Sequence, residues 1–502
     1  MSEYSPEQPN SASDTSPTDR RWRLGLAGVA LLSVLLRLRF VFTPITSDEG
    51  GYLAVARAWG HGKALYTDVW VDRPQGTLLL YRLWDTVSGG DEDHLRVIAL
   101  VVGAAAVVGV ASLVATLSGR RSHGLVAGAL CALLSAAPMV EGYSANGELL
   151  GGAFSVLCIA VAVRVLVAGA DRRWMFAAGA LGMVGFSMKQ AGIDGLAALG
   201  IWLTVVWVFA WRPRAETVGL LWRTVAGAGG VLALLMAHAA TLRWSDWWYA
   251  MFGYRLEQRS ALKGANWDRF WRTWADARPL FLPMLVGALV CAAVVLVRRQ
   301  SLRFAIEKAL LPLWLLCALA TFMSGGQFFH HYWVTLTFPV AALCGLVIAA
   351  APRELKAVSL AVIAAFSLWS WGELVVQSRS EIPVSISNET RPLKAEHVGH
   401  WLRRHMQSGD TLYAMCAAAH TYAHAHADPP YPYLWFDGVH QARGSQARLV
   451  SLFTENPPTW VAGFDAPNAC NPTGEVAEVL VAQYEQVATV DGVPIYRLLE
   501  PG

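Results

Sequence analysis

Long apolar segments recur along most of the chain and are separated by short polar loops. About eleven of these segments approach the roughly 20 residues that a helix needs to cross the hydrocarbon core of a membrane. They lie near residues 24–43, 95–118, 124–140, 149–170, 174–188, 191–211, 217–240, 279–297, 309–324, 332–351 and 355–376. The pattern predicts a polytopic α-helical membrane protein with about 11 transmembrane helices.

Charged residues in the loops predict how these helices are oriented across the membrane. Arg or Lys occupies every second loop, as in "GRRSHG" and "ADRRWM", and basic loops stay on the cytoplasmic side. We therefore expect a plasma (inner) membrane protein with a cytoplasmic amino terminus and, because the span number is odd, an extracytoplasmic carboxyl terminus. The Ser- and Pro-rich residues 1–23 are typical of a disordered cytoplasmic tail. No small-residue cleavage site follows the first span, which we interpret as a retained signal anchor.

Composition supports the membrane assignment. Of 502 residues, 55% are hydrophobic and 15% are charged, which excludes a chain built only of ordinary soluble domains. No P-loop, dinucleotide fingerprint or nucleophile elbow is visible. We expect the lipid bilayer as its surroundings and no nucleic acid partner.

The composition turns polar after residue 376. Helix-like and strand-like stretches alternate over residues 377–502, which predicts a small extracytoplasmic α/β domain. Cys416 and Cys470 would then lie in an oxidising compartment, where they could pair. The segment "HTYAHAHADPPYPY" carries His420, His424 and His426, which we interpret as solvated loop histidines in preference to a metal site.

Two long loops fall on the predicted outer face. The loop at 44–94 contains the acidic pair of "TSDEGG", Asp48 and Glu49, then Asp72 and Arg73, and we expect two short interfacial helices with a turn near Pro74. Its acids could equally be solvated charges or helix caps. The loop at 241–278 is dense in aromatic and basic residues, which indicates an interfacial helix, a cover for a lipid chain or an acceptor, or both.

Further polar side chains stand at the predicted outer ends of spans. A charge there is costly unless it faces the bundle interior, a cavity or the interface, so such positions are candidates for ligand binding. The candidates are Arg37, Arg39, Glu141, Asn146, Glu148, Lys189, Gln327, His330, His331 and Tyr332. Asn146 and Glu148 could instead cap a helix start.

The acidic pair after the first span, the Asp72-Arg73-Pro74 triplet and the late "HYW…FP" segment resemble lipid-dependent glycosyltransferases of the GT-C fold. The similarity is to family 39 mannosyltransferases and to ArnT-type aminoarabinose transferases, and it covers residues 24–376 in topology. Such enzymes take a sugar from a polyprenyl phosphate and give it to an extracytoplasmic lipid, glycan or protein. The resemblance thus implies a GT-C-like catalytic membrane domain, with the polar region 377–502 beside it.

The resemblance also implies roles for individual residues. Asp48 matches the family's catalytic acid and would act as general base in an inverting transfer, with Glu49 as the runner-up or as an orienting or metal-binding partner. Arg73 matches the phosphate-binding basic residue, and Asp72 matches the acid before it. One position departs from the pattern, because ArnT-type enzymes carry Arg where this chain has Gly51, so another cation must replace it or the pocket differs.

The other candidates extend this site. We assign Lys189, His330, His331, Tyr332 and Arg37, together with Arg73, to the donor phosphate. We assign Asp72, Asn146, Glu148 and Gln327 to the substrate. No cofactor is required by the pattern, and a divalent metal such as zinc or manganese stays an alternative, although no compact metal-binding spacing is visible.

Two other classes of membrane protein also have many transmembrane spans. One is a transporter or flippase of lipid-linked saccharides, and the other is a noncatalytic subunit of envelope assembly. A transporter should show paired half-bundles or matched broken helices, and the sequence shows neither.

Overall fold

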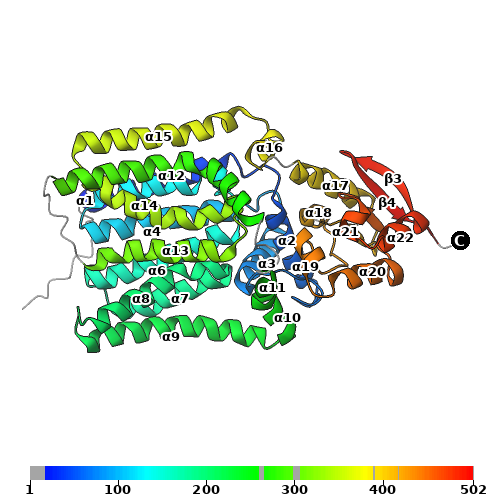
Figure 1. The fold of residues 1–502 in the computed structure, drawn as a ribbon, viewed down its shortest axis with the longest axis horizontal. Coiled ribbons are helices and arrows are strands. Elements are labelled where there is room, and N and C mark those ends of the chain that lie inside the picture. The colour runs from blue at the N-terminus through cyan, green and yellow to red at the C-terminus, as the bar shows by residue number, and fades with distance from the viewer. Residues whose placement is uncertain (1–16, 259–264, 298–305, 388–389, 417, 501–502) are drawn as a thin grey trace, which may run out of the picture.

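The structure, a computed structural model, describes residues 17–258, 265–297, 306–387, 390–416 and 418–500. Long helices run side by side through one half of the molecule, and a smaller region with the strands forms the other end (Figure 1). Helices α2 (Ser47–Gly60) and α3 (Gln75–Ser88) lie between the two parts. Most of the predicted tail, 1–16, lies outside the described residues, and its last residues are helical because α1 begins at Pro17.

Each predicted apolar segment contains a helix. These helices are α1 (Pro17–Leu38), α4 (Val97–Ser118), α5 (Arg121–Ser135), α6 (Gly147–Ala168), α7 (Trp174–Met188), α8 (Asp194–Val208), α9 (Arg214–Ala239), α12 (Ala265–Val297), α13 (Leu310–Gly325), α14 (Val334–Ala350) and α15 (Arg353–Val376). Within the described ranges, eight helical segments are long and apolar enough to cross a membrane. Helices α5 and α7 have only 15 residues, and α1 is charged at its start, so the number eleven stays a prediction.

Short helices connect and cover the bundle at the end that faces the strands. The first long loop forms α2 and α3, as predicted, and the second forms α10 (Trp244–Trp248), the π-helix η3 (Tyr249–Gly253) and α11 (Tyr254–Gln258). Single 3₁₀ turns are η1 (Pro138–Val140), η2 (Gln190–Ile193), η4 (Ile306–Ala309) and η5 (His330–Trp333).

Glu49 fixes the start of α2. Thr46 and Glu49 form a capping box, in which each side chain accepts the other residue's backbone N–H. The fully buried Glu49 carboxylate also receives two N–H groups of Arg96, with Nη2 at 2.7 Å from Oε2, and the backbone N–H of Ala145 at 2.9 Å. Arg96 in turn donates to the carbonyl oxygens of Phe40 and Pro44 after α1. One ion pair thus joins α2 to the ends of α1 and α4 and to the loop before α6.

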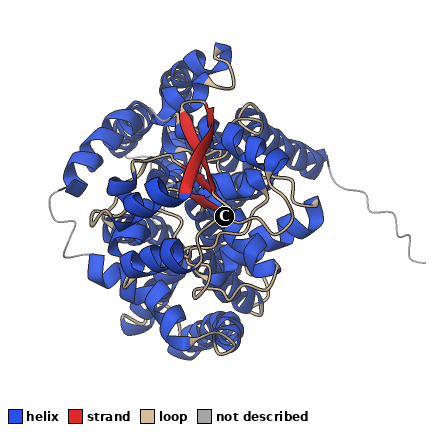
Figure 2. Cartoon of the chain, turned by 90° about the vertical axis from the view of Figure 1, so that its right-hand side faces the viewer, coloured by secondary structure: helices blue, strands red, loops and turns tan. Residues whose placement is uncertain are grey.

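The C-terminal region contains both helices and strands, as predicted. Its strands form one sheet in the order β1-β2-β4-β3, with β1 parallel to β2 and the other pairs antiparallel. The strands are drawn in red in Figure 2 and lie on the side that faces the viewer. The strands are β1 (Leu412–Ala414), β2 (Trp460–Ala462), β3 (Tyr484–Val490) and β4 (Val493–Leu498). The helices are α16 (Glu381–Ser387), α17 (Arg391–His405), α18 (Ala419–Ala425), α19 (Phe436–Gln441), α20 (Ser445–Glu455), α21 (Pro467–Cys470) and α22 (Glu475–Gln483).

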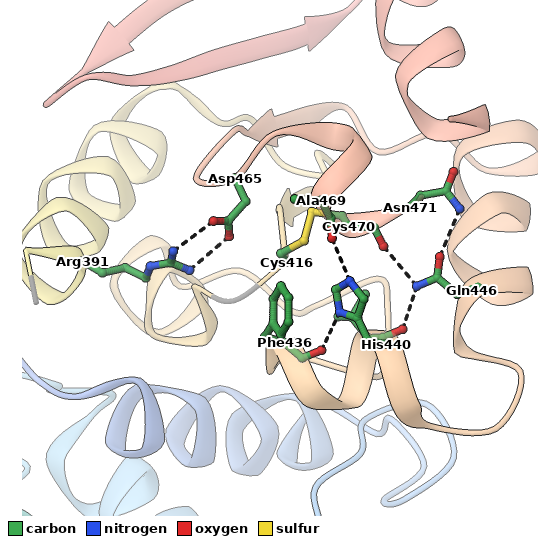
Figure 3. The surroundings of a disulfide bond; sticks show 10 residues. Arg391, Cys416, Phe436, His440, Gln446, Asp465, Ala469, Cys470 and Asn471 are labelled. Atoms are coloured by element: carbon green, nitrogen blue, oxygen red, sulfur yellow. Dashed lines mark hydrogen bonds and ion pairs between the residues drawn. A yellow bond between two sulfur atoms is a disulfide. The ribbon is translucent and has the colours of Figure 1, made fainter. Parts of the chain in front are cut away.

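A disulfide joins Cys416, just after β1, to Cys470 at the end of α21 (Figure 3). The pairing that the sequence left open is therefore formed in the structure. Nearby, Arg391 and Asp465 form a two-pronged ion pair at 3.0 and 3.1 Å. The other five cysteines are free and lie in membrane helices, where they pack as small apolar residues.

Glycines in α2 let the C-terminal region approach closely. A Cβ atom at Gly50 would lie 2.3 Å from Cβ of His420, and one at Gly51 would lie 2.4 Å from Cζ2 of Trp435. Arg57 of α2 donates to the carbonyl oxygen of Ala423 at 2.9 Å. The C-terminal region is thus docked on the helix that carries the acidic pair.

The Glu49–Arg96 ion pair yields a stability prediction. Arg96→Met leaves the buried Glu49 carboxylate without its cation, so the variant should lose about 3–5 kcal/mol of stability. The measurement is the apparent melting temperature of purified protein in detergent. Arg120→Met, at an exposed arginine, should leave that temperature unchanged. Equal melting temperatures for both variants would contradict the anchoring role.

Candidate active site

A cavity of about 260 Å³ opens where α2, the Asp72 loop and the C-terminal region meet. Its lining combines acids, cations and aromatic rings. It includes Asp48, Tyr52, Asp72, Arg73, Glu141, Asn146, Arg255, Gln327, His331, Tyr332, Trp435 and Asp437. The site is therefore assembled from at least four separate parts of the chain.

Asp48 points into this cavity from the first turn of α2. Its carboxylate accepts hydrogen bonds from the hydroxyl of Tyr52 and from Nε1 of Trp435, both at 3.0 Å. Nε2 of His331 lies 4.0 Å from Oδ2. The side chain keeps 25% of its surface exposed, so a carboxylate oxygen stays accessible from the cavity.

Glu49 has a different environment, although it is the next residue. Successive helical residues point about 100° apart, so Glu49 turns toward α4 and lines neither this cavity nor the one described below. Its carboxylate is fully occupied by Arg96 and two backbone N–H groups. The structure therefore does not place Glu49 where it could touch a substrate.

Two arginines surround Asp72. Oδ1 accepts from Nη1 of Arg73 at 2.8 Å, and Arg255 of α11 forms an ion pair with Oδ2. Burial by itself would raise the pKa of Asp72, but the two guanidinium groups lower it below its ordinary value. Arg73 also donates from Nε to the Tyr52 hydroxyl at 2.9 Å, which connects these cations to the partner of Asp48.

Arg255 escaped the sequence analysis. The loop at 241–278 stood out as aromatic and basic, but nothing in its pattern distinguished Arg255 from the other basic residues around it. Its pairing with Asp72 spans 183 positions, and only the folded chain reveals it. Trp435 was missed for the same reason, whereas Tyr52 lies four positions after Asp48 in α2, and this helical spacing could have revealed it.

A second cavity, of about 600 Å³, adjoins the first and is mainly apolar. Arg73, Arg255, Gln327 and Tyr332 line both cavities. Its apolar lining includes Phe186, Met251, Phe252, Leu256, Trp267, Phe322, Met323 and Phe328. The two spaces therefore share a polar wall that carries two arginines and a tyrosine.

Lys189 reaches the second cavity from the end of α7. It forms a buried ion pair with Glu148, and its ammonium group lies 4.1 Å from the centre of the Tyr332 ring. Nε2 of His331 lies 3.7 Å from Glu148, and Nδ1 lies 3.1 Å from Glu141. Burial alone would raise the pKa of Glu141, but the hydrogen bond to His331 and the charges of His331 and His330 lower it.

Three predicted site residues have mainly structural partners. Arg37 donates to the carbonyl oxygens of Gly142 and Ser135 and lines neither cavity, so it is not placed to bind a donor phosphate. His330 pairs outward with Asp276 at 2.9 Å and also lines neither cavity. Asn146 borders the first cavity, yet its side-chain oxygen Oδ1 caps α6 by accepting a hydrogen bond from the backbone N–H of Leu149.

Gln327 lines both cavities, and its side-chain oxygen accepts from Arg269 at 2.8 Å. Exposed Arg39 donates to the carbonyl oxygen of Gln377.

One group of three side chains in the described part of the chain has ligand atoms close enough together to hold a metal. The group is Glu92, His400 and His424, and none of these residues lines either cavity.

No family model and no curated protein matches this sequence. Solved structures do match its fold. ArnT from Cupriavidus metallidurans bound to undecaprenyl phosphate aligns with a TM-score of 0.63 and 14% identity over 96% of this chain and 99% of ArnT. The apo state of ArnT from the same organism aligns with a TM-score of 0.66 and 12% identity, over 97% of this chain and 100% of ArnT. The Archaeoglobus fulgidus oligosaccharyltransferase tethered with an acceptor peptide aligns with a TM-score of 0.52 and 13% identity, over 93% of this chain and 72% of the oligosaccharyltransferase. The chain thus has the GT-C fold of these membrane glycosyltransferases.

Proposed function

We propose that this protein is a membrane glycosyltransferase that moves a sugar from a polyprenyl-phosphate donor to an extracytoplasmic acceptor. The observation that carries the proposal is the polar wall between the two cavities. An apolar space suits a prenyl chain, cations at its end suit a phosphate, and an accessible carboxylate faces the adjoining space.

The donor phosphate would bind at the shared wall. Arg73 and Arg255 supply two positive charges there, Lys189 supplies a third from the second cavity, and the Tyr332 hydroxyl supplies a further donor. Asp72 and Glu148 balance two of these three charges in the structure. These five side chains thus carry one net positive charge, and the arginines can exchange a carboxylate partner for phosphate oxygens. Arg255 or Lys189 would take the place of the arginine that is replaced by Gly51.

Asp48 would act as the base. The acceptor hydroxyl attacks the anomeric carbon from the face opposite the phosphate, and its proton moves to the Asp48 carboxylate. The bond between the anomeric carbon and the phosphate oxygen breaks, and the phosphate leaves with the electron pair. A phosphate is a good leaving group, so no acid is needed, and the configuration inverts. Tyr52 and Trp435 would hold the carboxylate in place.

The remaining candidates divide between binding and support. Gln327 and His331, beside the first cavity, suit contacts to the sugar or phosphate. Glu49, Arg37 and Asn146 would position the elements that carry the site. Residues 24–376 would form the catalytic membrane domain, and 377–502 an extracytoplasmic domain that closes over it.

Asp48→Asn tests the base. The substitution keeps the size of the side chain and the hydrogen bond from Trp435 but removes the basic oxygen, so transfer should fall by about 100-fold or more in a folded, membrane-inserted protein. The measurement is sugar transfer from radiolabelled polyprenyl-phosphate sugars to a membrane extract. Asp93→Asn, at an exposed acid of the same loop, is the matched control. Wild-type transfer by the Asp48 variant would exclude this mechanism.

Arg255→Ala tests the phosphate site. Loss of one charge-assisted contact, worth about 1.5–3 kcal/mol, should raise the KM for the donor by about 10-fold or more. Arg243→Ala removes an exposed arginine from the same loop and should leave the KM unchanged. An unchanged KM in both variants would place the phosphate elsewhere.

Reporter fusions test the orientation. An enzyme that is active only outside the cytoplasm should be active when fused after Gly502 and inactive when fused after Gly119, beside the basic Arg120 and Arg121. Reversed activities would overturn the proposed topology.

A further inference from the structure

Three histidines from distant parts of the chain surround the carboxylate of Glu92. Glu92 lies in the loop between α3 and α4, and it is buried. His400 of α17 and His424 of α18 approach Oε1, with Nε2 at 3.7 Å and Nδ1 at 3.6 Å. His426, just after α18, lies 3.0 Å from Oε2. The cluster joins the membrane part of the chain to the C-terminal region.

The cluster uses two of the three histidines of "HTYAHAHADPPYPY". Their interpretation as solvated loop histidines is wrong for His420 and His424, which are buried in α18. His420, the third, instead packs against Gly50 of α2. Glu92 and His400 complete the group, although they stand far from this segment in the sequence. Side-chain spacing within one segment therefore could not reveal the group.

The distances fit metal ligands better than hydrogen bonds. A separation of 3.6–3.7 Å between nitrogen and oxygen exceeds the range of a hydrogen bond. Two ligands about 2.0–2.1 Å from a tetrahedral zinc ion lie about 3.3–3.5 Å apart. The ligand atoms of Glu92, His400 and His424 all lie within 4.8 Å of one another.

His424 supplies an independent observation. Its side chain is 1% exposed, and neither ring nitrogen has a hydrogen-bond partner among the residues that the structure describes. Buried polar atoms are almost always paired, so a histidine of this kind, aimed at a carboxylate, needs an explanation. A bound cation satisfies its nitrogen and the Glu92 oxygen together.

We propose that Glu92, His400 and His424 bind a divalent transition metal of the zinc class, with water as a fourth ligand. His426 then holds Oε2 of Glu92 and turns Oε1 toward the ion, in the way that hydrogen-bonded partners orient metal ligands. Arg403 lies 3.9 Å from Oε1, and its side chain is half exposed, so it can turn to solvent when the metal binds.

The position of this site indicates a structural role. Arg57 of α2 donates to the carbonyl oxygens of Gly90 and Ala423, on either side of the cluster. The Glu92 loop leads directly into Arg96, the partner of Glu49. A metal here fastens the C-terminal region, which supplies Trp435 to Asp48, onto the membrane domain. This inference does not depend on the proposed transferase activity.

The test uses full-length protein purified in detergent without a histidine tag. After removal of metal with a chelator, zinc is titrated against a chromogenic competitor, and melting temperature is measured with and without zinc. We expect one tight site and a higher melting temperature with zinc. Cobalt in place of zinc should give the visible absorption typical of four-coordinate cobalt.

Three variants separate this site from adventitious binding. Loss of a hydrogen-bond partner of a ligand costs about 10–100-fold in metal affinity, so loss of a ligand should cost about 100-fold or more. His400→Ala, at a partly exposed position, and His424→Gln should both show this loss and no shift of melting temperature with zinc. His405→Ala, at an exposed histidine of α17, should behave as wild type.

The outcomes are decisive without any activity assay. Should His424→Gln fail to fold, the result for His400→Ala decides. Wild-type affinity in His400→Ala, or the absence of a tight site in the unsubstituted protein, would overturn the proposal and leave the cluster as a histidine–carboxylate ion pair.

Discussion

The ion pair between Glu49 and Arg96 determines where everything else in this site can stand. Both side chains are almost completely buried, so neither charge can be left without the other. The pair ties the amino end of α2 to the ends of α1 and α4, and through Ala145 to the start of α6. Because Glu49 is held on this side of α2, Asp48 must face the other side, where the cavity lies. The buried ion pair of Glu49 thus determines the direction in which the side chain of Asp48 points.

The polar wall between the cavities is built from opposed charges. Arg73 and Arg255 share Asp72, and Lys189 pairs with Glu148. Each cation would otherwise be costly at the edge of a membrane, and its carboxylate partner lowers that cost. The same arrangement keeps the guanidinium groups oriented and ready for an anionic ligand. Stability of the empty site and affinity for phosphate therefore rest on the same side chains.

The sequence predicted those features that depend on local pattern. Apolar length predicted a helix within each bundle segment, and compartment chemistry made a Cys416–Cys470 pair possible. Asp48 was singled out by its place after the first span and by its match to the acidic position of GT-C enzymes, and it does line the cavity. The local pattern could not separate Asp48 from Glu49, because their difference is set by Arg96, 47 positions from Glu49.

Long-range partners account for the remaining differences between the predicted site and the site in the structure. Arg37 and His330 are polar side chains near the predicted outer ends of spans, but carbonyl oxygens already engage Arg37 and Asp276 already engages His330. Arg255 and Trp435 reach the site only through tertiary folding, and Trp435 lies 387 positions from its partner Asp48. Hydropathy and motif spacing contain no information on contacts of this range.

The packing of Trp435 against Gly51 makes two distant positions a single steric unit. No side chain fits at position 51 while the indole ring occupies that space, because even a Cβ atom would lie 2.4 Å from it. An arginine introduced at position 51 alone would push the C-terminal region away from α2. An arginine at position 51 therefore requires either a smaller side chain at position 435 or a C-terminal region that lies farther from α2.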